Sequence, residues 1–524
     1  CRRMSRGKKF LIRGEAAIAM VLAVVVCVNM ICFGPMATLI GLATGNGTLS
    51  DETNEEAAKV AEEIMEDGIV LLKNESQLPL NETKKLNIFG WESINPAYGG
   101  AGSGGINDLY DIVSLNQGLE NAGFSINQEL VDFYNNYGAD NPEMSIQKQS
   151  WTLPEPPVDT YSDELIKSAK EYSDVAVVVL SRKAGEGHND IPMDVRKAAY
   201  DNNSDEYDDF PEGEHYLQLS QTERDMVDMV CSNFDNVIVY NGANQFELGF
   251  ADEYPQIKSV VWCPGTGNVG FNALGKVFSG EVNPSGKTPD TFIYDMTTAP
   301  WWNNAEKTEY TNLADMAVEG MNAGTAQVYA PAFTNYVEGI YVGYKYYETA
   351  AQEGAIDYDK TVQYPFGYGL SYTEFEQKMG ELKEKDGQIS VDVEVTNTGD
   401  VAGKDVVEVY YKPPYTNGGI EKSSANLIEF AKTDLLQPGE SQMVTVTFSI
   451  EDMASYDENN AKAYVLEKGD YVISINSDSH TVLDQKTYTA DKDVVYKGEN
   501  KRASDDTAAT NVFEDAKGDV TYLS

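Results

Sequence analysis

The chain has 524 residues, of which 42% are hydrophobic and 10% aromatic, so it can bury several cores and bulk disorder is disfavoured. Its net charge of −45 would repel nucleic-acid phosphates, and we expect no nucleic acid as a partner. The length accommodates a terminal segment and two or three domains.

The N-terminus differs from the rest of the chain in charge. Six basic residues and one acid give residues 1–45 a net charge of +5, which leaves −50 for the remainder. They precede an apolar run from Ala16 to about Phe33 that is long enough to span a bilayer. Because the basic flank stays cytoplasmic, we expect a single-pass transmembrane anchor in the cell membrane, with the bulk of the chain extracellular. A cleavable signal peptide is the alternative.

Five cysteines are too few for a disulfide framework. Cys27 and Cys32 lie in the apolar run, whereas Cys231 and Cys263 lie in apolar stretches typical of buried thiols. The sequence leaves undecided whether a disulfide bond joins Cys231 and Cys263. The chain begins with Cys rather than Met, which favours a fragment or a reading frame translated past its start.

Residues 46–375 alternate helices with apolar strands. A polar, acidic stalk over 46–56 precedes a helix whose apolar residues run from Val60 to Met65, and a short apolar run follows at 69–72. Ser220 and Glu223 form the capping box of a helix over 221–234. Continuous apolar strands between such helices predict a layered α/β sandwich domain with a mostly parallel sheet; they are expected at 86–89, 175–180, 237–240 and 257–262.

From about 388 to 475 the pattern changes to short alternating strands separated by turn residues, such as Asn397-Thr-Gly-Asp400 and Pro438-Gly-Glu440. Regularly spaced strands without helices predict an all-β sandwich of fibronectin type III-like or immunoglobulin-like shape, which we place at 376–490. The charged stretch 491–524 is typical of a linker.

Gly100-Ala-Gly-Ser-Gly-Gly105 matches the dinucleotide-binding pattern G-x-G-x-x-G. In such a site the glycines turn directly from strand into helix, but here Trp91 to Tyr98 lie between the strand at 86–89 and the glycines. A flexible loop near a ligand is the more economical interpretation, and we expect no cofactor. Only three histidines and no zinc motif occur, so we also expect no metal.

Gly185-Glu186-Gly187 follows the strand at 175–180, at the sheet edge where ligands bind in parallel sheets. Flanking glycines would let Glu186 swing onto a substrate, although an acidic residue between two glycines is more often a solvent-exposed residue with no role in binding. His188 and Asp190 either orient it or are simply solvated. Trp301-Trp302 either stacks on a sugar or packs inside the domain, and packing is favoured.

Together these segments resemble glycoside hydrolase family 3, of the β-glucosidase type, over roughly residues 55–480. The sandwich resembles that family's fibronectin type III-like domain through Val395-Thr-Asn-Thr-Gly399 and Val406-Val-Glu-Val-Tyr-Tyr411. The α/β sandwich domain of the family is matched by Glu66-Asp-Gly-Ile-Val-Leu-Leu-Lys-Asn74, Gly185-Glu-Gly187, Trp262-Cys-Pro-Gly265, Asn283-Pro-Ser-Gly-Lys287, Gly339-Ile-Tyr-Val-Gly-Tyr344 and Tyr364-Pro-Phe-Gly-Tyr-Gly-Leu-Ser-Tyr372.

The resemblance implies a retaining mechanism with two carboxylates about 5 Å apart, acting on β-linked glucosides or short oligosaccharides. By motif, Glu186 is the acid/base. The loop at 187–190 is one residue longer than the commonest form, which leaves His188 and Asp190 as weak substrate-binding candidates. The aspartate nucleophile of the family lies in a (β/α)8 barrel, usually within Ser-Asp-Trp, and this sequence contains no Ser-Asp-Trp.

Two hypotheses follow. In the first, the chain supplies the acid/base domain of a β-glucosidase whose barrel comes after residue 524, as in members with inverted domain order, so the chain as given is incomplete and inactive. The final stretch 512–524 resembles the approach to such a barrel. In the second, the chain is a non-catalytic, membrane-anchored carbohydrate-binding or scaffold protein from the same family. The sequence does not decide whether glucosides or xylosides are preferred. It does not decide the oligomeric state either, and a homodimer is one option.

Overall fold

The computed structural model divides the chain into two units, Cys1–Val60 and Ala61–Ser524. Glu186, His188 and Asp190 lie outside the residues that it describes, as does the stretch 512–524. The described residues are 6–33, 50–100, 104–106, 110–140, 151–183, 195, 200–304, 308–309, 311–322, 325–329, 332–333 and 338–511.

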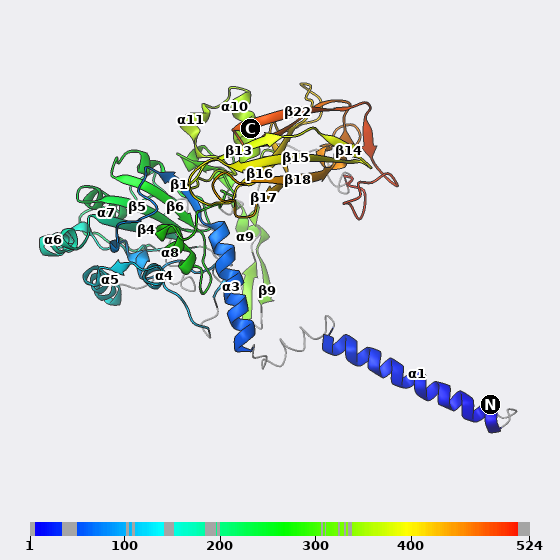
Figure 1. The fold of residues 1–524 in the computed structure, drawn as a ribbon, viewed down its shortest axis with the longest axis horizontal. Coiled ribbons are helices and arrows are strands. Elements are labelled where there is room, and N and C mark those ends of the chain that lie inside the picture. Colours follow the sequence, from blue (N-terminus) through cyan, green and yellow to red (C-terminus); the bar gives the residue numbers. More distant parts are fainter. Residues whose placement is uncertain are drawn as a thin grey trace. The chain divides into compact units, whose positions relative to one another are not determined.

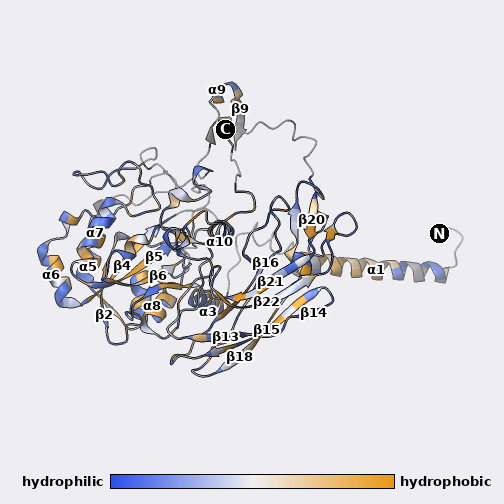
Figure 2. Cartoon of the chain, turned by 90° about the horizontal axis from the view of Figure 1, so that it is seen from above, coloured by the Kyte–Doolittle hydropathy of each residue, from blue (hydrophilic) through white to orange (hydrophobic). Residues whose placement is uncertain are grey.

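The N-terminal helix α1 (Arg6–Phe33) is continuous, and its segment Gly7–Asn29 is long and apolar enough to cross a membrane. Figure 2 shows the hydrophobic colour along much of this helix. The expected apolar helix is therefore present, but a signal sequence has the same length and composition. A second helix, α3 (Asp51–Gly68), ends at the predicted glycine but already begins at Asp51, so most of the expected stalk is helical.

The second unit contains a six-stranded sheet in the order β1-β6-β5-β4-β2-β3, and Figure 1 shows helices flanking it. All neighbouring strands are parallel except β1, which pairs antiparallel with β6. The mostly parallel sheet is thus confirmed, and the apolar run at 69–72 becomes its antiparallel edge strand. The strands are β1 (Val70–Asn74), β2 (Lys85–Phe89), β3 (Ser125–Ile126), β4 (Val175–Arg182), β5 (Asp235–Gly242) and β6 (Ile257–Cys263).

Helices cover both faces of this sheet. Helices α5 (Gln128–Asp140), α6 (Asp163–Tyr172) and α7 (Gln221–Cys231) contribute to one core, whereas α4 (Leu115–Asn121) and α8 (Phe271–Ser279) contribute to the other. Successive residues of β4 enter the two cores alternately, because strand side chains point to opposite faces. Double-sided burial explains why the strands are continuously apolar.

The two buried cysteines are free thiols. Cys231 belongs to the core with α7, whereas Cys263 belongs to the core on the other face of the sheet. The sheet therefore separates the two sulfur atoms, and the bridge left open by the sequence is absent.

Between the sheet and the C-terminal sandwich, the chain forms short elements. Strands β7 (Phe292–Ile293) and β12 (Val362–Tyr364) pair with each other, and helices α10 (Tyr344–Gln352) and α11 (Tyr358–Thr361) precede β12. The described part of this region also contains β8 (Thr308–Glu309) paired with β11 (Ala332–Phe333), β9 (Val318–Asn322) paired with β10 (Thr325–Tyr329), the short helix α9 (Leu313–Met316) and two 3-10 turns at Met296–Thr298 and Trp302–Asn304.

The C-terminal part is the predicted all-β sandwich. Two antiparallel sheets, β13-β15-β14 with β18 and β17-β16-β21-β22, enclose one apolar core. Their strands are β13 (Phe375–Met379), β14 (Lys383–Lys385), β15 (Gln388–Asn397), β16 (Val406–Lys412), β17 (Asn426–Lys432), β18 (Ser441–Ser449), β21 (Gly469–Asn476) and β22 (Val482–Ala490).

A small third sheet changes the expected boundary at residue 490. It joins β19 (Ser455–Asp457), β20 (Ala463–Leu466) and β23 (Val494–Tyr496). Residues 494–496 therefore pair with the sandwich through β20 instead of opening a linker at 491. The short strand was missed because three hydrophobic residues among charged neighbours carry little periodic signal.

Helices α4 and α8 approach each other through glycines. A Cβ added at Gly275 would lie 2.2 Å from the Gly118 oxygen and 2.9 Å from the Ala122 Cβ. Backbone cannot move aside as a flexible side chain can, so only glycine permits this approach at Gly275.

We therefore expect Gly275→Ala to lower the free energy of unfolding by about 1–3 kcal/mol, although alanine is otherwise the better helix former. Urea denaturation measures the change. Gly68→Ala is the matched control, since a Cβ there would meet no atom within 4 Å. Equal stability of the two variants would contradict the close approach.

Candidate functional site at the carboxyl edge of the parallel sheet

The parallel strands β2, β4, β5 and β6 end at one edge of the sheet. Ligands of open α/β sheets bind at this edge, outside the carboxyl ends of the strands. Strand β4 ends at Arg182, and Glu186 follows four residues later in the chain. The described residues therefore include the start of the loop that carries the expected acid/base, although Glu186 itself lies outside them.

Arg182 fixes the end of β4 from inside the protein. Its side chain is fully buried and donates five hydrogen bonds of 2.6–2.9 Å. Two of them form a bidentate pair with the Glu223 carboxylate, the geometry that suits a guanidinium best. The other three go to the backbone oxygens of Ser181, Tyr216 and Gln218.

Aromatic rings enclose this ion pair. The guanidinium carbon of Arg182 lies 5.1 Å from the ring centroid of Tyr216 and 4.7 Å from that of Phe246. Burial disfavours the charge, but the attraction and hydrogen bonds of Glu223 outweigh burial and raise the pKa of Arg182. Arg182 therefore stays charged, and it ties the end of β4 to Glu223 on the first turn of α7.

A second buried carboxyl group fixes the turn after β2. Glu155 accepts hydrogen bonds from the Trp91 nitrogen at 2.7 Å and from the Tyr161 hydroxyl at 2.6 Å. The Tyr134 hydroxyl bonds Tyr161 and accepts from the Gly90 nitrogen, both at 2.7 Å. Burial raises the pKa of Glu155 to about 8. These groups hold the backbone that follows β2 in one position.

Glu92 and Lys183 link the two strand ends. The Lys183 Nζ lies 3.5 Å from the Glu92 carboxylate and 6.0 Å from the Trp91 ring centroid. Glu92 is buried, and burial raises the pKa of its carboxyl group. The last described residue before the Glu186 loop is thus directed towards the turn after β2.

Asn241 joins β5 and β6 to the segment that leads to the glycine-rich loop. Its amide oxygen accepts from the Ala97 nitrogen at 2.6 Å, and its amide nitrogen donates to Ala97 and Cys263 oxygens. Helix α4 begins only at Leu115. Strand β2 ends at Phe89, so the glycine pattern that begins at Gly100 does not follow the strand directly, as a dinucleotide site requires.

Trp301 and Trp302 pack in a separate apolar cluster rather than standing free. Trp302 meets the His215 ring edge-on at 4.8 Å, and His215 Nε2 lies 3.0 Å from a Glu247 carboxylate oxygen. The packing interpretation is confirmed. Within the described ranges, no group of three His, Cys, Asp or Glu side chains is placed to hold a metal ion.

Sequence reasoning missed most of the buried polar residues that fix the strand ends at this edge of the sheet. Glu223 was recognised only as a capping residue, which it also is, and Arg182, Glu155 and Glu92 were not singled out. A charged residue two positions after the apolar run 175–180, Arg182, was the available signal. Its partners, however, come from segments far away in the chain.

Comparison with known proteins identifies this fold. A model described as the glycosyl hydrolase family 3 C-terminal domain matches residues 69–372, and one described as a fibronectin type III-like domain matches residues 405–479. The first match alone covers more than half of the chain. The chain belongs to glycosyl hydrolase family 3.

Individual relatives agree with this assignment. The chain is 33% identical to a beta-glucosidase of Ruminococcus albus, over 84% of this chain and 41% of that protein. It is 32% identical to beta-glucosidase A of Butyrivibrio fibrisolvens, over 87% of this chain and 53% of that protein. Beta-glucosidase 3B from Thermotoga neapolitana, solved in complex with alpha-D-glucose, has a TM-score of 0.67 and 29% identity over 85% of this chain and 55% of that chain. The chain thus spans about half the length of these relatives.

The Arg182–Glu223 pair makes a prediction about stability. Glu223→Gln keeps the size and the capping oxygen but leaves a buried guanidinium without its counter-charge, which costs on the order of 3 kcal/mol. Asp357→Asn is the control, because Asp357 and its partner Lys360 are both exposed and water screens such a pair. Chemical denaturation compares the two; equal losses would show that the buried pair does not hold the end of β4.

Proposed function

We propose that this chain supplies the acid/base half of a retaining β-glycosidase of the β-glucosidase type, with Glu186 as the acid/base. Family membership and relatives named beta-glucosidases support the reaction class. The single observation that supports the assignment is that the Arg182–Glu223 pair fixes the end of β4. This pair gives the loop that carries Glu186 a rigid starting point at the ligand-binding edge of the sheet.

The nucleophile, in this proposal, belongs to a (β/α)8 barrel outside the 524 residues, and these residues alone do not hydrolyse glucosides. The lack of Ser-Asp-Trp in the sequence supports the idea. Retaining hydrolysis requires two carboxyl groups on opposite sides of the scissile bond. His188 and Asp190 are proposed only as neighbours that contact the substrate, which is a β-linked glucoside or a short oligosaccharide.

The proposed acid/base is tested by Glu186→Ala in the protein with its barrel. A poor leaving group needs a proton as its bond breaks, so hydrolysis of cellobiose should fall by about 10²–10⁴-fold. Glycosylation by an activated aryl glucoside should suffer less, since that leaving group departs unaided. The glycosyl-enzyme should then accumulate, and azide should speed turnover because it attacks without base assistance.

Glu186→Gln serves as the matched variant that keeps the size of the side chain. Equal losses on both substrates, together with no effect of azide, would remove Glu186 from the mechanism. An unaltered activity of the alanine variant would favour the alternative, in which this part of the chain is a non-catalytic carbohydrate-binding or scaffold domain.

We also propose that α1 remains as an uncleaved anchor and that the chain after residue 45 faces outward. The basic residues before the apolar segment support this orientation. Protease added to intact cells should release the domains after residue 45 and leave a small membrane-bound stub. A chain found without α1 would indicate a signal sequence, and full protection from protease would contradict the outward orientation.

A further inference from the structure

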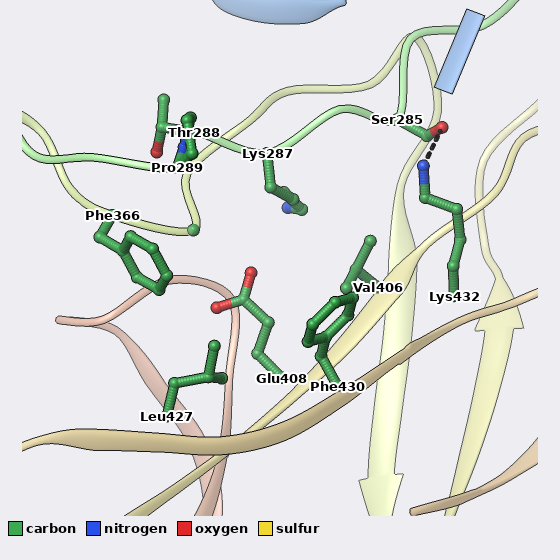
Figure 3. Close-up of a pocket in the computed structure, with 11 residues that line it drawn as sticks. Ser285, Lys287, Thr288, Pro289, Phe366, Val406, Glu408, Leu427, Phe430 and Lys432 are labelled. Atoms are coloured by element: carbon green, nitrogen blue, oxygen red, sulfur yellow. Dashed lines mark hydrogen bonds between the residues drawn. The ribbon is translucent and has the colours of Figure 1, made fainter. Parts of the chain in front are cut away.

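An open pocket of about 290 Å³ lies at the contact between the α/β domain and the sandwich, and Glu408 forms part of its wall. Figure 3 shows the Glu408 carboxyl group directed into this pocket, with Lys287 opposite and aromatic side chains around it. The residues lining the pocket come from both domains: Ser285, Lys287, Thr288, Pro289, Phe366, Gly367, Val406, Glu408, Leu427, Phe430 and Lys432.

The Glu408 carboxyl group lies against the backbone of a loop of the other domain. A Cβ added at Gly367 would lie 2.3 Å and 2.7 Å from its two oxygens, and Gly367 has a φ of +82°. The Tyr410 hydroxyl donates to one of these oxygens at 2.8 Å. The Lys287 ammonium donates instead to the Gly369 oxygen at 3.1 Å. Glu408 thus packs on Gly367 without a cation in hydrogen-bonding contact among the described residues.

A second titratable contact holds the other side of the same loop. The Ser479 nitrogen of the sandwich donates to the Phe366 oxygen at 2.8 Å. The next residue, His480, has its Nδ1 2.8 Å from the Glu348 carboxylate of α10, and its ring stacks on Tyr358 at 3.7 Å. Ser479 donates to the same Glu348 carboxylate at 2.9 Å.

The loop between these contacts continues into the central sheet. The Leu370 nitrogen donates to the Leu71 oxygen of β1 at 2.8 Å, and the Gly367 nitrogen donates to the Thr288 oxygen at 2.8 Å. A change at Glu408 or His480 therefore acts on a segment that is hydrogen-bonded to the edge of the sheet.

We propose that Glu408 and the His480–Glu348 pair make the contact between the two domains a pH-dependent clamp on the loop Tyr364–Tyr372, closed at mildly acidic pH and loosened as the pH rises. One ion pair at the same interface keeps the domains joined in both states. The Asp67 carboxylate accepts from Lys404 at 2.9 Å, and although burial opposes its charge, its pKa is lowered by Lys404 and Lys432.

The direction of the effect follows from the two titrating groups. Burial raises the pKa of Glu408 to about 8 from an ordinary value of 4.5. The contribution of Glu408 to the stability of the contact between the two domains is therefore complete below about pH 4.5 and is lost as the pH rises through about 8. The hydrogen bond to Glu348 raises the pKa of His480 above its ordinary value of 6.5, so that contribution is complete below pH 6.5 and is lost above the raised value.

Other charged groups near Glu408 and His480 change the two pKa values but do not reverse the direction of either shift. Lys287 favours the ionised form of Glu408, whereas Asp405 and Asp478 oppose it. Around His480, the carboxylates favour the protonated ring and burial opposes it. The titratable and charged groups that face the two sites are Lys287, Tyr344, Glu348, Tyr358, Asp359, Asp405, Tyr410, Lys432 and Asp478.

Hydrogen–deuterium exchange of the whole chain in detergent micelles, at pH 5.5 and pH 8.0, tests the clamp. Wild type is compared with Glu408→Gln at the same pH, so intrinsic exchange rates cancel. At pH 8.0 the peptide that covers residues 364–372 should exchange at least about tenfold faster in wild type than in the variant. At pH 5.5 the difference should be far smaller than at pH 8.0, because Glu408 is protonated in the closed contact and only about one pH unit separates the solution from its ordinary pKa of 4.5.

Glu394→Gln is the matched control, since it removes the same charge from an exposed position on β15. It should behave like wild type at both values of pH, whereas adding His480→Gln to Glu408→Gln should flatten the remaining pH dependence. The proposal is overturned if the loop in Glu408→Gln keeps the pH dependence of wild type. It is also overturned if the exchange rises equally throughout the sandwich and is not centred on residues 364–372.

Discussion

Burial of a parallel sheet on both faces is the constraint on which the rest of the α/β domain depends. Helices cover both sides of β4, β5 and β6, so the middle of each strand is apolar and polar side chains lie towards the two strand ends. Polar groups that serve a ligand are therefore confined to the edge where the strands stop. The same burial creates the need for Arg182, Glu155 and Asn241, because each backbone segment at that edge requires a partner.

The frame at this edge is built from buried polar groups that are each held by specific partners. Arg182 is held by Glu223 and by three backbone oxygens, and Glu155 is held by Trp91 and Tyr161. Removing one partner leaves a buried charge or an unpaired donor, which costs more than the intact pair contributes. Such a frame gives the residues that follow β4 a fixed origin. The proposed role of Glu186 depends on that origin.

The sandwich is not an independent appendage to this domain. It contacts the loop that carries the family-like motif Tyr364–Tyr372, and that loop in turn bonds β1. Motif residues that resembled ordinary turns in the sequence are thus part of a domain interface. The contacts with Glu408 and Ser479 are made by the backbone of this loop, at Gly367 and Phe366.

The sequence by itself determined α1, α3 and α7, four strands of the parallel sheet and the two-domain order, because apolar periodicity and the Ser220–Glu223 capping box are local signals. It did not predict α4, α5, α6 or α8. It also determined the family, through motifs in their order, but the role of Glu186 came from that resemblance and stays a prediction. Only the tertiary structure decided that Arg182 meets Glu223, 41 residues away, and that Glu408 lies against Gly367. Such pairs leave no periodic trace, since they depend on which chain segments the two cores and the domain contact bring together.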